Sequence, residues 1–333
     1  MNERAVGIDV SKRKLDVCLV TGNKFKSKVF DNSESGHRAL NTWLQDRGLD
    51  ADVAICMEAT GPYSEGVATA LADAGWRVSV VNPARVKGFA QSQLTRNKND
   101  RIDAKLVAIF AQRCELEVWT PPSPALRELR ALVERLQALT DMRQQELNRL
   151  EAMEQSTPGA VARTVHDHVA WLDRQMAQIE SDIDDHINGH PELKRDAELI
   201  RSIPGIGART AARILAYLGD LRRFRSAKAA AAFVGVTPKQ RQSGTSIRGR
   251  TVLCRAGHAA ARRSLYMPGL VALRHNPVIM AMAQRLRGKG LAPKAIVGAS
   301  MRRLVHLIYG VVTSGKPFDA KIPLEGVAVQ DGI

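Results

Sequence analysis

Four acidic residues have the types and positions that suit a divalent-metal site. Asp9 ends an apolar run in "AVGIDVS", and Glu58 ends another in "AICMEAT". Asp100 and Asp103 stand three residues apart at the start of an apolar-periodic segment, so on a helix they share a face. Four converging carboxylates repel one another unless cations are present. Mg²⁺ prefers hard oxygen ligands, and two ions about 4 Å apart can stabilise the attacking and leaving oxygens of a phosphodiester.

Each acid also has a simpler interpretation when it is taken alone. Asp9 could cap a turn, because "SKRK" follows directly after its strand. Asp100 and Asp103 would suit the N-terminus of any helix, where negative charge is favoured. The metal hypothesis therefore depends on the four acids converging, and it predicts that the elements carrying them meet at one edge of the fold.

A second group of reactive or phosphate-binding residues lies in "PKQRQSGTSIRGR", residues 238–250. It contains two serines and three arginines: Ser243, Ser246, Arg241, Arg248 and Arg250. Arginine suits bidentate phosphate contacts, so composition alone predicts a phosphate-binding loop with the serines as hydrogen-bond donors. A serine nucleophile needs a base or a metal to activate it, and the nearest histidine is 15 residues away. A metal held elsewhere in the chain is the plausible activator.

The segment "LIRSIPGIGARTAARILAYLG", residues 199–219, is typical of a helix–hairpin–helix. Gly205 and Gly207 allow a tight turn, and the helix that begins near Arg209 presents its N-terminus to a phosphate. An ordinary turn between two helices is the alternative. We expect these three residues to contact nucleic acid.

The first 120 residues must position the four acids, and their pattern is α/β. Residues 4–10, 15–20 and 24–30 read as three antiparallel strands, followed by a helix, a strand at 52–58, a helix and a strand at 77–82. This is the order of a ribonuclease H-like sheet, in which the fourth strand lies beside the first. That topology brings Asp9 next to Glu58.

Consecutive prolines in "WTPPSP" mark a domain boundary. Apolar residues then recur at helical spacing over 126–150 and 161–187, with a break at "QSTPGA". This pattern predicts a helical hairpin. The hairpin is either self-contained, used for dimerisation, or a plain helical linker. The remainder reads as mostly helical. We expect a catalytic domain at 1–120, a coiled-coil hairpin at 121–190 and a basic domain at 191–333.

Charge is distributed unevenly along the chain. Residues 201–317 hold 22 Lys and Arg against one acid, a balance of +21, so the overall +15 leaves −6 for the rest. A basic half of this size predicts binding to a polyanion, with nucleic acid favoured over a membrane surface. The sequence starts without an apolar signal region, no membrane span is expected, and four scattered cysteines predict reduced thiols in the cytoplasm.

Several motifs together are similar to the DEDD-type transposases of bridge-RNA-encoding bacterial insertion sequences, over nearly the whole chain. They are "GIDVSKRKLDV", "EATGPY", "VNPARVKGFAQS", "RNKNDRIDAKLVA", "SIPGIG", "AFVGVTPKQRQSG" and "RRSLYMP". The resemblance implies a RuvC-like N-terminal domain, a coiled-coil hairpin and a C-terminal domain with a catalytic serine. By position, the acidic tetrad is Asp9, Glu58, Asp100 and Asp103. The serine is Ser243, with Ser246 the weaker candidate.

The resemblance also implies partners and a mechanism. A structured noncoding RNA would pair with donor and target DNA. The residues do not show this RNA, but they are compatible with it, because no base-reading helix-turn-helix is evident. The enzyme would be a dimer or tetramer on DNA in the cytoplasm, associated with the nucleoid. Mg²⁺ on the acids of one protomer and the serine of another would cut DNA through a covalent phosphoserine, and arginines of the 238–250 segment would hold the phosphate.

Three other functions remain as alternatives. A RuvC-like nuclease or Holliday junction resolvase would use metal-activated water and form no covalent intermediate. A basic nucleic-acid-packaging protein would not need Asp9 or Glu58. An actin-like ATPase would suit "GIDVS", but no second phosphate-binding segment accompanies it, and the basic half would have no role.

Overall fold

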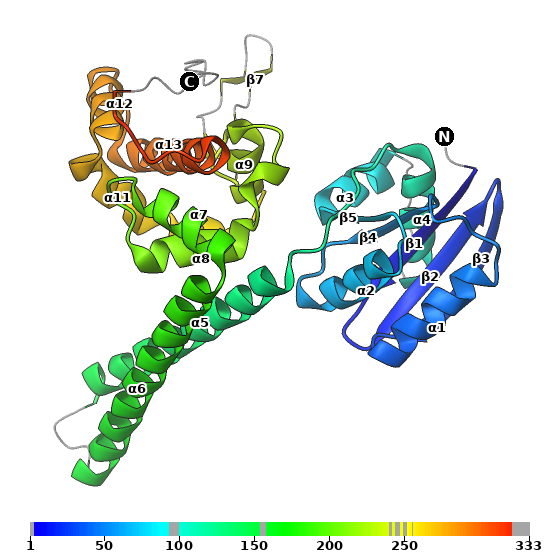
Figure 1. The fold of residues 1–333 in the computed structure, drawn as a ribbon, viewed down its shortest axis with the longest axis horizontal. Coiled ribbons are helices and arrows are strands. Elements are labelled where there is room, and N and C mark those ends of the chain that lie inside the picture. The colour runs from blue at the N-terminus through cyan, green and yellow to red at the C-terminus, as the bar shows by residue number, and fades with distance from the viewer. Residues whose placement is uncertain are drawn as a thin grey trace. The chain divides into compact units, whose positions relative to one another are not determined.

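A computed structural model describes residues 3–92, 100–153, 158–239, 242–243, 247–248, 252–254 and 256–321. The chain divides into two compact units, Met1–Pro121 and Pro122–Ile333 (Figure 1). The first unit is a mixed α/β sheet with helices and the second is mostly helical, as the sequence predicts. Each unit is described below by itself.

The first unit is built on a five-stranded sheet in the order β3-β2-β1-β4-β5. β1 pairs antiparallel with β2 and parallel with β4. The pairing with β4 confirms the prediction that the fourth strand lies beside the first. Its elements are β1 (Arg4–Val10), β2 (Lys14–Thr21), β3 (Lys24–Asp31), α1 (Glu34–Gln45), β4 (Ala54–Glu58), α2 (Pro62–Asp73), β5 (Val78–Val81), α3 (Pro83–Ser92) and α4 (Asp100–Arg113).

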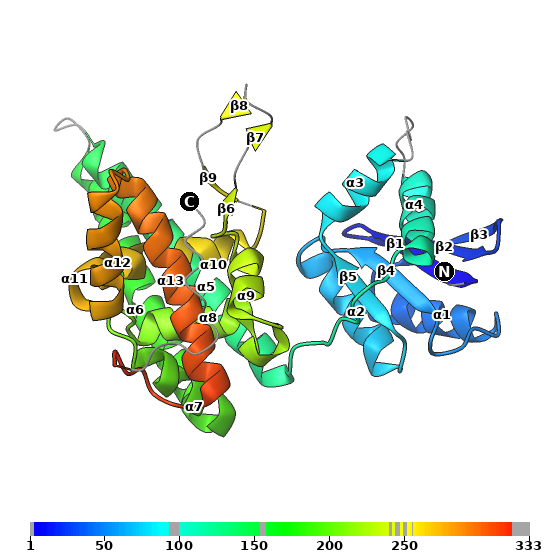
Figure 2. The same ribbon diagram turned by 90° about the horizontal axis from the view of Figure 1, so that it is seen from above.

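Helices cover both faces of this sheet, and each face has its own apolar core (Figure 2). α1 and α2 pack on the side chains of Val6 and Ile8, whereas α3 and α4 pack on the opposite face, which includes Ala5 and Cys56. Because side chains alternate along a strand, each position of β1 and β4 is assigned to one core or the other. We call the second face the α4 face.

The second unit begins with two long antiparallel helices that lie side by side, α5 (Pro124–Glu151) and α6 (Gly159–Gly189) (Figure 1). Ser123 caps α5 by accepting a hydrogen bond from the amide of Leu126. Leu129, Val133 and Leu136 of α5 are buried in the same core as the C-terminal helices. The start of the hairpin is therefore part of the C-terminal core.

The rest of the second unit is a helical bundle with two short antiparallel strand pairs. Its elements are α7 (Pro191–Arg201), α8 (Ala208–Leu218), η1 (Leu221–Arg223), α9 (Ala227–Val234), β6 (Pro238–Lys239), β7 (Gln242–Ser243), β8 (Ile247–Arg248), β9 (Val252–Leu253), α10 (Ala259–Ser264), α11 (Tyr266–His275), α12 (Pro277–Gly288) and α13 (Pro293–Ser314). α13 is long and apolar enough to cross a membrane, but 67% of its most apolar window is buried inside the protein. It is a core helix of this bundle.

Candidate active site

The two strand-end acids lie on adjacent strands and on one face of the sheet. Ile8 of β1 is opposite Met57 of β4 in the parallel register, so the next positions along these strands are Asp9 and Glu58. Both continue the alternation that places Ala5 and Cys56 on the α4 face. Neighbouring strands lie about 4.7–4.9 Å apart, so the two carboxylates leave the sheet side by side. Both side chains are half-buried.

The start of α4 reaches the same edge of the sheet. A Cβ on Gly7 would overlap the backbone of Ala104 and Ala108, so this glycine lets α4 lie directly on β1. At the far end of α4, Gln112 donates a hydrogen bond of 3.0 Å to the carbonyl of Gly22, which lies beside the start of β1. α4 is therefore antiparallel to β1, and its first turn lies at the end that carries Asp9.

That first turn contains the other two predicted acids. Asp103 directly precedes Ala104, and its side chain is half-buried. Asp100 is the first residue of α4, and its side chain is outside the described residues. The backbone thus brings all four acidic positions to one edge of the sheet. Among the described residues, no group of three or more His, Cys, Asp or Glu side chains is arranged to hold a metal ion.

The donor set at this edge suits a hard divalent cation. Asp9, Glu58 and Asp103 supply carboxylate oxygens from three elements, and Asp100 adds a fourth at the same helix N-terminus. Oxygen ligands are the type that Mg²⁺ selects over nitrogen or sulfur. The neighbouring Cys56 is unsuited to ligation, because burial raises the pKa of its thiol to about 12 despite the nearby Arg85 cation. The residues at this edge therefore fit a metal of the Mg²⁺ class.

A fifth acid at this edge, Asp16, was not predicted from the sequence. It lies directly opposite Asp9 in the β1–β2 register and is only 8% exposed. Its Oδ2 is 3.2 Å from Nζ of Lys14, so a cation offsets the repulsion between two opposed carboxylates. The sequence supports this pairing only once the register is fixed: Asp9 and Asp16 each lie two residues outside the "SKRK" turn, but neither residue by itself indicates what it faces.

One side-chain amide joins the loop after Asp9 to the start of α2, the helix that follows Glu58. Nδ2 of Asn32 donates to the carbonyl of Ser11 at 2.9 Å and to the carbonyl of Tyr63 at 3.1 Å. Ser11 is two residues beyond Asp9, and Tyr63 is the second residue of α2, the helix after Glu58. Oδ1 of Asn32 is 2.8 Å from Nε2 of His37, a contact that fixes which way the amide faces. Asn32 is thus a positioning residue that the sequence analysis missed.

Ser243 ends a strand of a short hairpin in the second unit. β7 pairs with β8 so that Ser243 is opposite Ile247, and β6 pairs with β9 closer to the bundle. The base of this hairpin is fixed by the hydrogen bond from the Cys254 amide to the Thr237 carbonyl at 2.7 Å. The side chains of Ser243 and Arg248 are outside the described residues. Arg241, Ser246 and Arg250 lie wholly outside them.

The segment predicted to be a helix–hairpin–helix contains two helices, α7 and α8, joined by a tight turn. Gly205 has a φ of +102°, and a Cβ there would lie 3.1 Å from the backbone nitrogen of Ala272 in α11. Gly205 is therefore required for close packing between the turn and α11. Gly207 is exposed and precedes α8, which has no side-chain cap. Arg209 is paired with Glu180 of α6 at 2.6 Å.

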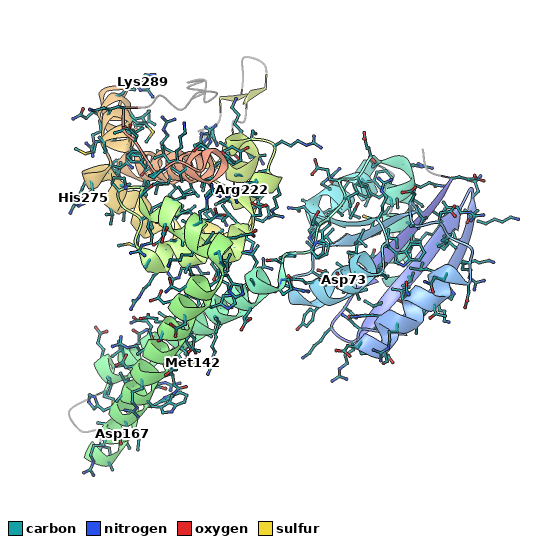
Figure 3. The ribbon with its side chains drawn as sticks, in the orientation of Figure 1. Asp73, Met142, Asp167, Arg222, His275 and Lys289 are labelled. Atoms are coloured by element: carbon teal, nitrogen blue, oxygen red, sulfur yellow. The ribbon has the colours of Figure 1, made fainter. Side chains whose placement is uncertain are left out.

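Asp220, the one acid within residues 201–317, forms a hydrogen bond with an arginine. Arg222, labelled in Figure 3, contacts Asp196 through two hydrogen bonds of 2.7 and 2.8 Å and Asp220 through one of 3.2 Å. Hydrogen bonding to Asp196 is the main reason that the pKa of Arg222 is raised. Asp196 and Asp220 are thus engaged in holding α7 against η1.

Comparison with known proteins assigns the chain to a class of DNA-processing enzymes. A transposase model of the IS110 DEDD type matches residues 6–157, and a model of the IS116/IS110/IS902 transposase family matches residues 197–284. The pilin gene-inverting protein of Moraxella lacunata is 32% identical over 97% of this chain and 99% of its own length. The corresponding protein of Moraxella bovis is 31% identical with the same coverage.

The chain belongs to the IS110 family of transposases. A more distant relative, the transposase for insertion sequence element IS1111A of Coxiella burnetii, is 24% identical over 57% of this chain and 58% of its own length. The first family match contains all four predicted acids, and the second contains the serine hairpin.

Proposed function

We propose that this protein is a metal-dependent DNA recombinase that exchanges strands through a covalent serine–DNA link. The observation that carries the proposal is the gathering of Asp9, Glu58 and the first turn of α4 at one edge of the sheet. The strand order β3-β2-β1-β4-β5 supports a RuvC-like assignment for this unit. The two Moraxella relatives are described as pilin gene-inverting proteins, which favours a reaction that both cuts and rejoins DNA.

Asp9, Glu58, Asp100 and Asp103 would hold Mg²⁺ through their carboxylate oxygens. When bound there, the ion would supply a positive centre for the phosphodiester oxygens and lower the pKa of a nearby hydroxyl. The protein's own contribution is rigidity. Gly7 sets the distance of α4 from β1, and Asn32 joins the loop after Asp9 to the start of α2 after Glu58.

Ser243 is proposed as the nucleophile. Its Oγ attacks the phosphorus of a DNA phosphodiester, an O–P bond to serine forms, and the bond to the leaving strand breaks. The leaving oxygen takes the proton that the serine loses. Because one phosphodiester replaces another, a strand hydroxyl can attack the phosphoserine in reverse and reseal DNA without ATP. Arg241, Arg248 and Arg250 would contact the phosphate that is attacked.

The acids and the serine lie in different units of the chain. We therefore propose a composite site in which the acids of one protomer act with the serine of another, so that assembly into a dimer or tetramer controls cutting. Sequence selection would be delegated to a structured noncoding RNA that pairs with donor and target DNA. The protein would act in the cytoplasm, at the nucleoid.

The covalent link is tested by a denaturing gel after reaction with labelled DNA and Mg²⁺. The wild type is expected to give a protein–DNA adduct that Ser243→Ala abolishes and Ser246→Ala retains. Asp9→Asn and Glu58→Gln are expected to lose both cutting and adduct. A Ser243→Ala protein that cuts at the wild-type rate, with no adduct from the wild type, would instead establish a hydrolytic nuclease.

The composite site and the RNA are tested separately. A mixture of Asp9→Asn and Ser243→Ala proteins is expected to recover activity that neither has alone, because an intact acid set and an intact serine can meet. Absence of recovery would place both groups in one protomer. Sequencing of RNA that co-purifies with the protein tests the guide, and a preparation that is active without RNA would exclude it.

A further inference from the structure

A small cationic pocket lies in the second unit, between α5 of the helical hairpin and two helices of the bundle. It has a volume of about 60 Å³ and is formed by α5, α8 and α10. Its walls are Gln137, Arg213, Tyr217, Ala260, Arg263 and Ser264. A water molecule needs about 10–15 Å³ of such space, so the pocket has room for a larger polar group. None of these residues belongs to the carboxylate edge or the serine hairpin.

Among the residues that the structure describes, the two arginines of this pocket lack the carboxylate partners that two other arginines of the unit have. Arg209 and Arg222 are paired with carboxylates. In the described parts of the chain, neither Arg213 nor Arg263 forms an ion pair or a side-chain hydrogen bond. Two guanidinium groups at one pocket repel each other, and a bound anion would remove that cost.

The charges around the pocket favour an anion. The positive charges of Arg130, Arg213 and Arg263 lower the pKa of Tyr217, and the negative charge of Glu134 raises it. Glu134 is also shared with Arg130, whose Nε is 3.9 Å from its Oε1. Gln137 donates to Asp141 at 2.8 Å, one turn further along α5. The pocket therefore keeps an excess of positive charge after the acids that face Tyr217 are counted.

Tyr217 contributes a hydrogen-bond donor to the lining of the pocket. The residue is 5% exposed, and its ring packs against His258, with the ring centroids 5.3 Å apart. Burial is the main reason that the pKa of the hydroxyl is raised, so the phenol keeps its proton at neutral pH. A protonated phenol beside two guanidinium groups is suited to donate to the oxygens of a tetrahedral anion.

We propose that this pocket binds one backbone phosphate of a nucleic acid, through Arg213, Arg263 and Tyr217. Arginine and tyrosine are frequent donors to nucleic-acid phosphates, and such contacts fix the position of a strand without reading its sequence. α10 begins six residues after β9, so a phosphate held here would anchor nucleic acid close to the base of the serine hairpin in the chain. The proposal rests on the nucleic-acid substrate of the proposed function, and on neither the acids nor Ser243.

The test measures binding of labelled duplex DNA and labelled RNA to the full-length protein over a range of salt concentrations. Loss of one phosphate contact lowers the slope of log K against log salt by about 0.9 for duplex DNA and about 0.7 for a single strand. Arg213→Gln with Arg263→Gln is expected to lower the slope by at least that amount and the affinity by about tenfold. Whichever of the two nucleic acids, DNA or RNA, loses affinity for the variant is the one whose phosphate occupies the pocket.

A matched control has the same change in charge at another place in the unit. Arg163 and Arg174 are exposed residues of α6, so Arg163→Gln with Arg174→Gln removes two charges away from the pocket. Equal effects of the two double variants would overturn the proposal, because they would indicate only a diffuse attraction to a basic protein. Binding is measured without divalent metal, so the catalytic acids hold no phosphate in any of the proteins compared. A failure here therefore leaves the adduct and cutting tests of the proposed function unaffected.

Two further measurements cover the case in which the double variant does not fold. Tyr217→Phe keeps the ring contact with His258 and removes only the donor, so we expect about tenfold weaker binding. In the wild type, nucleic acid is expected to protect Arg213 and Arg263 from phenylglyoxal modification and to leave Arg163 and Arg174 reactive. Equal reactivity of the pocket arginines with and without nucleic acid would refute the site.

Discussion

Oδ1 of Asn32 lies 2.8 Å from Nε2 of His37, and this contact turns the amide nitrogen of Asn32 toward two backbone carbonyls. The carbonyl of Ser11 belongs to the loop after Asp9, and that of Tyr63 to the first turn of α2, the helix that follows Glu58. A side chain that coordinates no metal thus joins the two halves of the proposed metal site. Interactions of this kind commonly change metal affinity or activity by about 10- to 100-fold when they are lost.

Asn32→Asp is the sharpest test of this arrangement because it preserves shape. The carboxylate presents an acceptor to two carbonyl acceptors, so we expect the Ser11 loop and the start of α2 to separate. The Mg²⁺ concentration for half-maximal cutting should then rise at least about tenfold. His37→Gln can still donate to Asn32, and we expect it to have a smaller effect. Equal Mg²⁺ dependence in wild type and Asn32→Asp would show that Asn32 serves stability alone.

Asp16 is expected to act as a neighbour of the metal site and not as a ligand. It pairs with Lys14 and stands opposite Asp9. Asp16→Asn should reduce cutting about tenfold, and additional Mg²⁺ should restore most of the loss. Asp9→Asn should remain inactive at every Mg²⁺ concentration. If the two variants respond alike to Mg²⁺, Asp16 is a ligand.

Gly7→Ala is expected to displace α4 from β1, because the added methyl group would overlap the backbone of Ala104 and Ala108. Overpacking of this type destabilises a protein by about 1–3 kcal/mol. We expect lower thermal stability and, at a temperature where the variant is still folded, lower cutting activity. Gly66→Ala is the matched control, because a Cβ there makes an ordinary contact with His37 and alanine favours the α2 helix by about 0.5–1 kcal/mol.

His306 is expected to make stability depend on pH. It is 6% exposed on α13, and its Nε2 has no hydrogen-bond partner among the described residues. Burial is the main reason that its pKa is lowered to about 4, with Arg302, Arg303 and Lys228 adding to the effect. The unfolded chain therefore binds a proton below about pH 6.5 that the folded chain does not. Stability from this group is present above pH 6.5 and is lost as pH falls toward 4.

Denaturation of wild type and His306→Gln at pH 7.5 and pH 4.5 checks this expectation. We expect the wild type to lose about 2–3 kcal/mol more than the variant between these two pH values, because glutamine does not titrate. Parallel losses in the two proteins would show that other groups control acid unfolding.

The sequence predicts the N-terminal sheet well because its strands carry strong alternating or continuous apolar patterns. The ends of the first and fourth strands, and hence Asp9 and Glu58, are confirmed as neighbours by the register. Asp16 was not recognised, since a single acid inside an apolar strand gives no local signal of what it faces. Asn32 was missed for a different reason: its role depends on three segments that meet only in the folded chain.

The second unit is less predictable from local pattern. Strands of two residues, such as β7 and β8, are too short to show a period, so the sequence predicts a loop for the serine segment. Gly205 was assigned to phosphate binding because glycine is typical of such turns. The structure shows that Gly205 also meets a packing requirement at α11, which sequence spacing cannot reveal.

Leu129, Val133 and Leu136 place the first turns of α5 inside the C-terminal core. A protein cut after residue 190 would separate these side chains from Ile200, Leu215 and the other residues that cover them, leaving both fragments with open apolar surfaces. A cut between Pro121 and Pro122 would leave each core whole. The helical hairpin and the basic bundle should therefore be produced together as a single fragment.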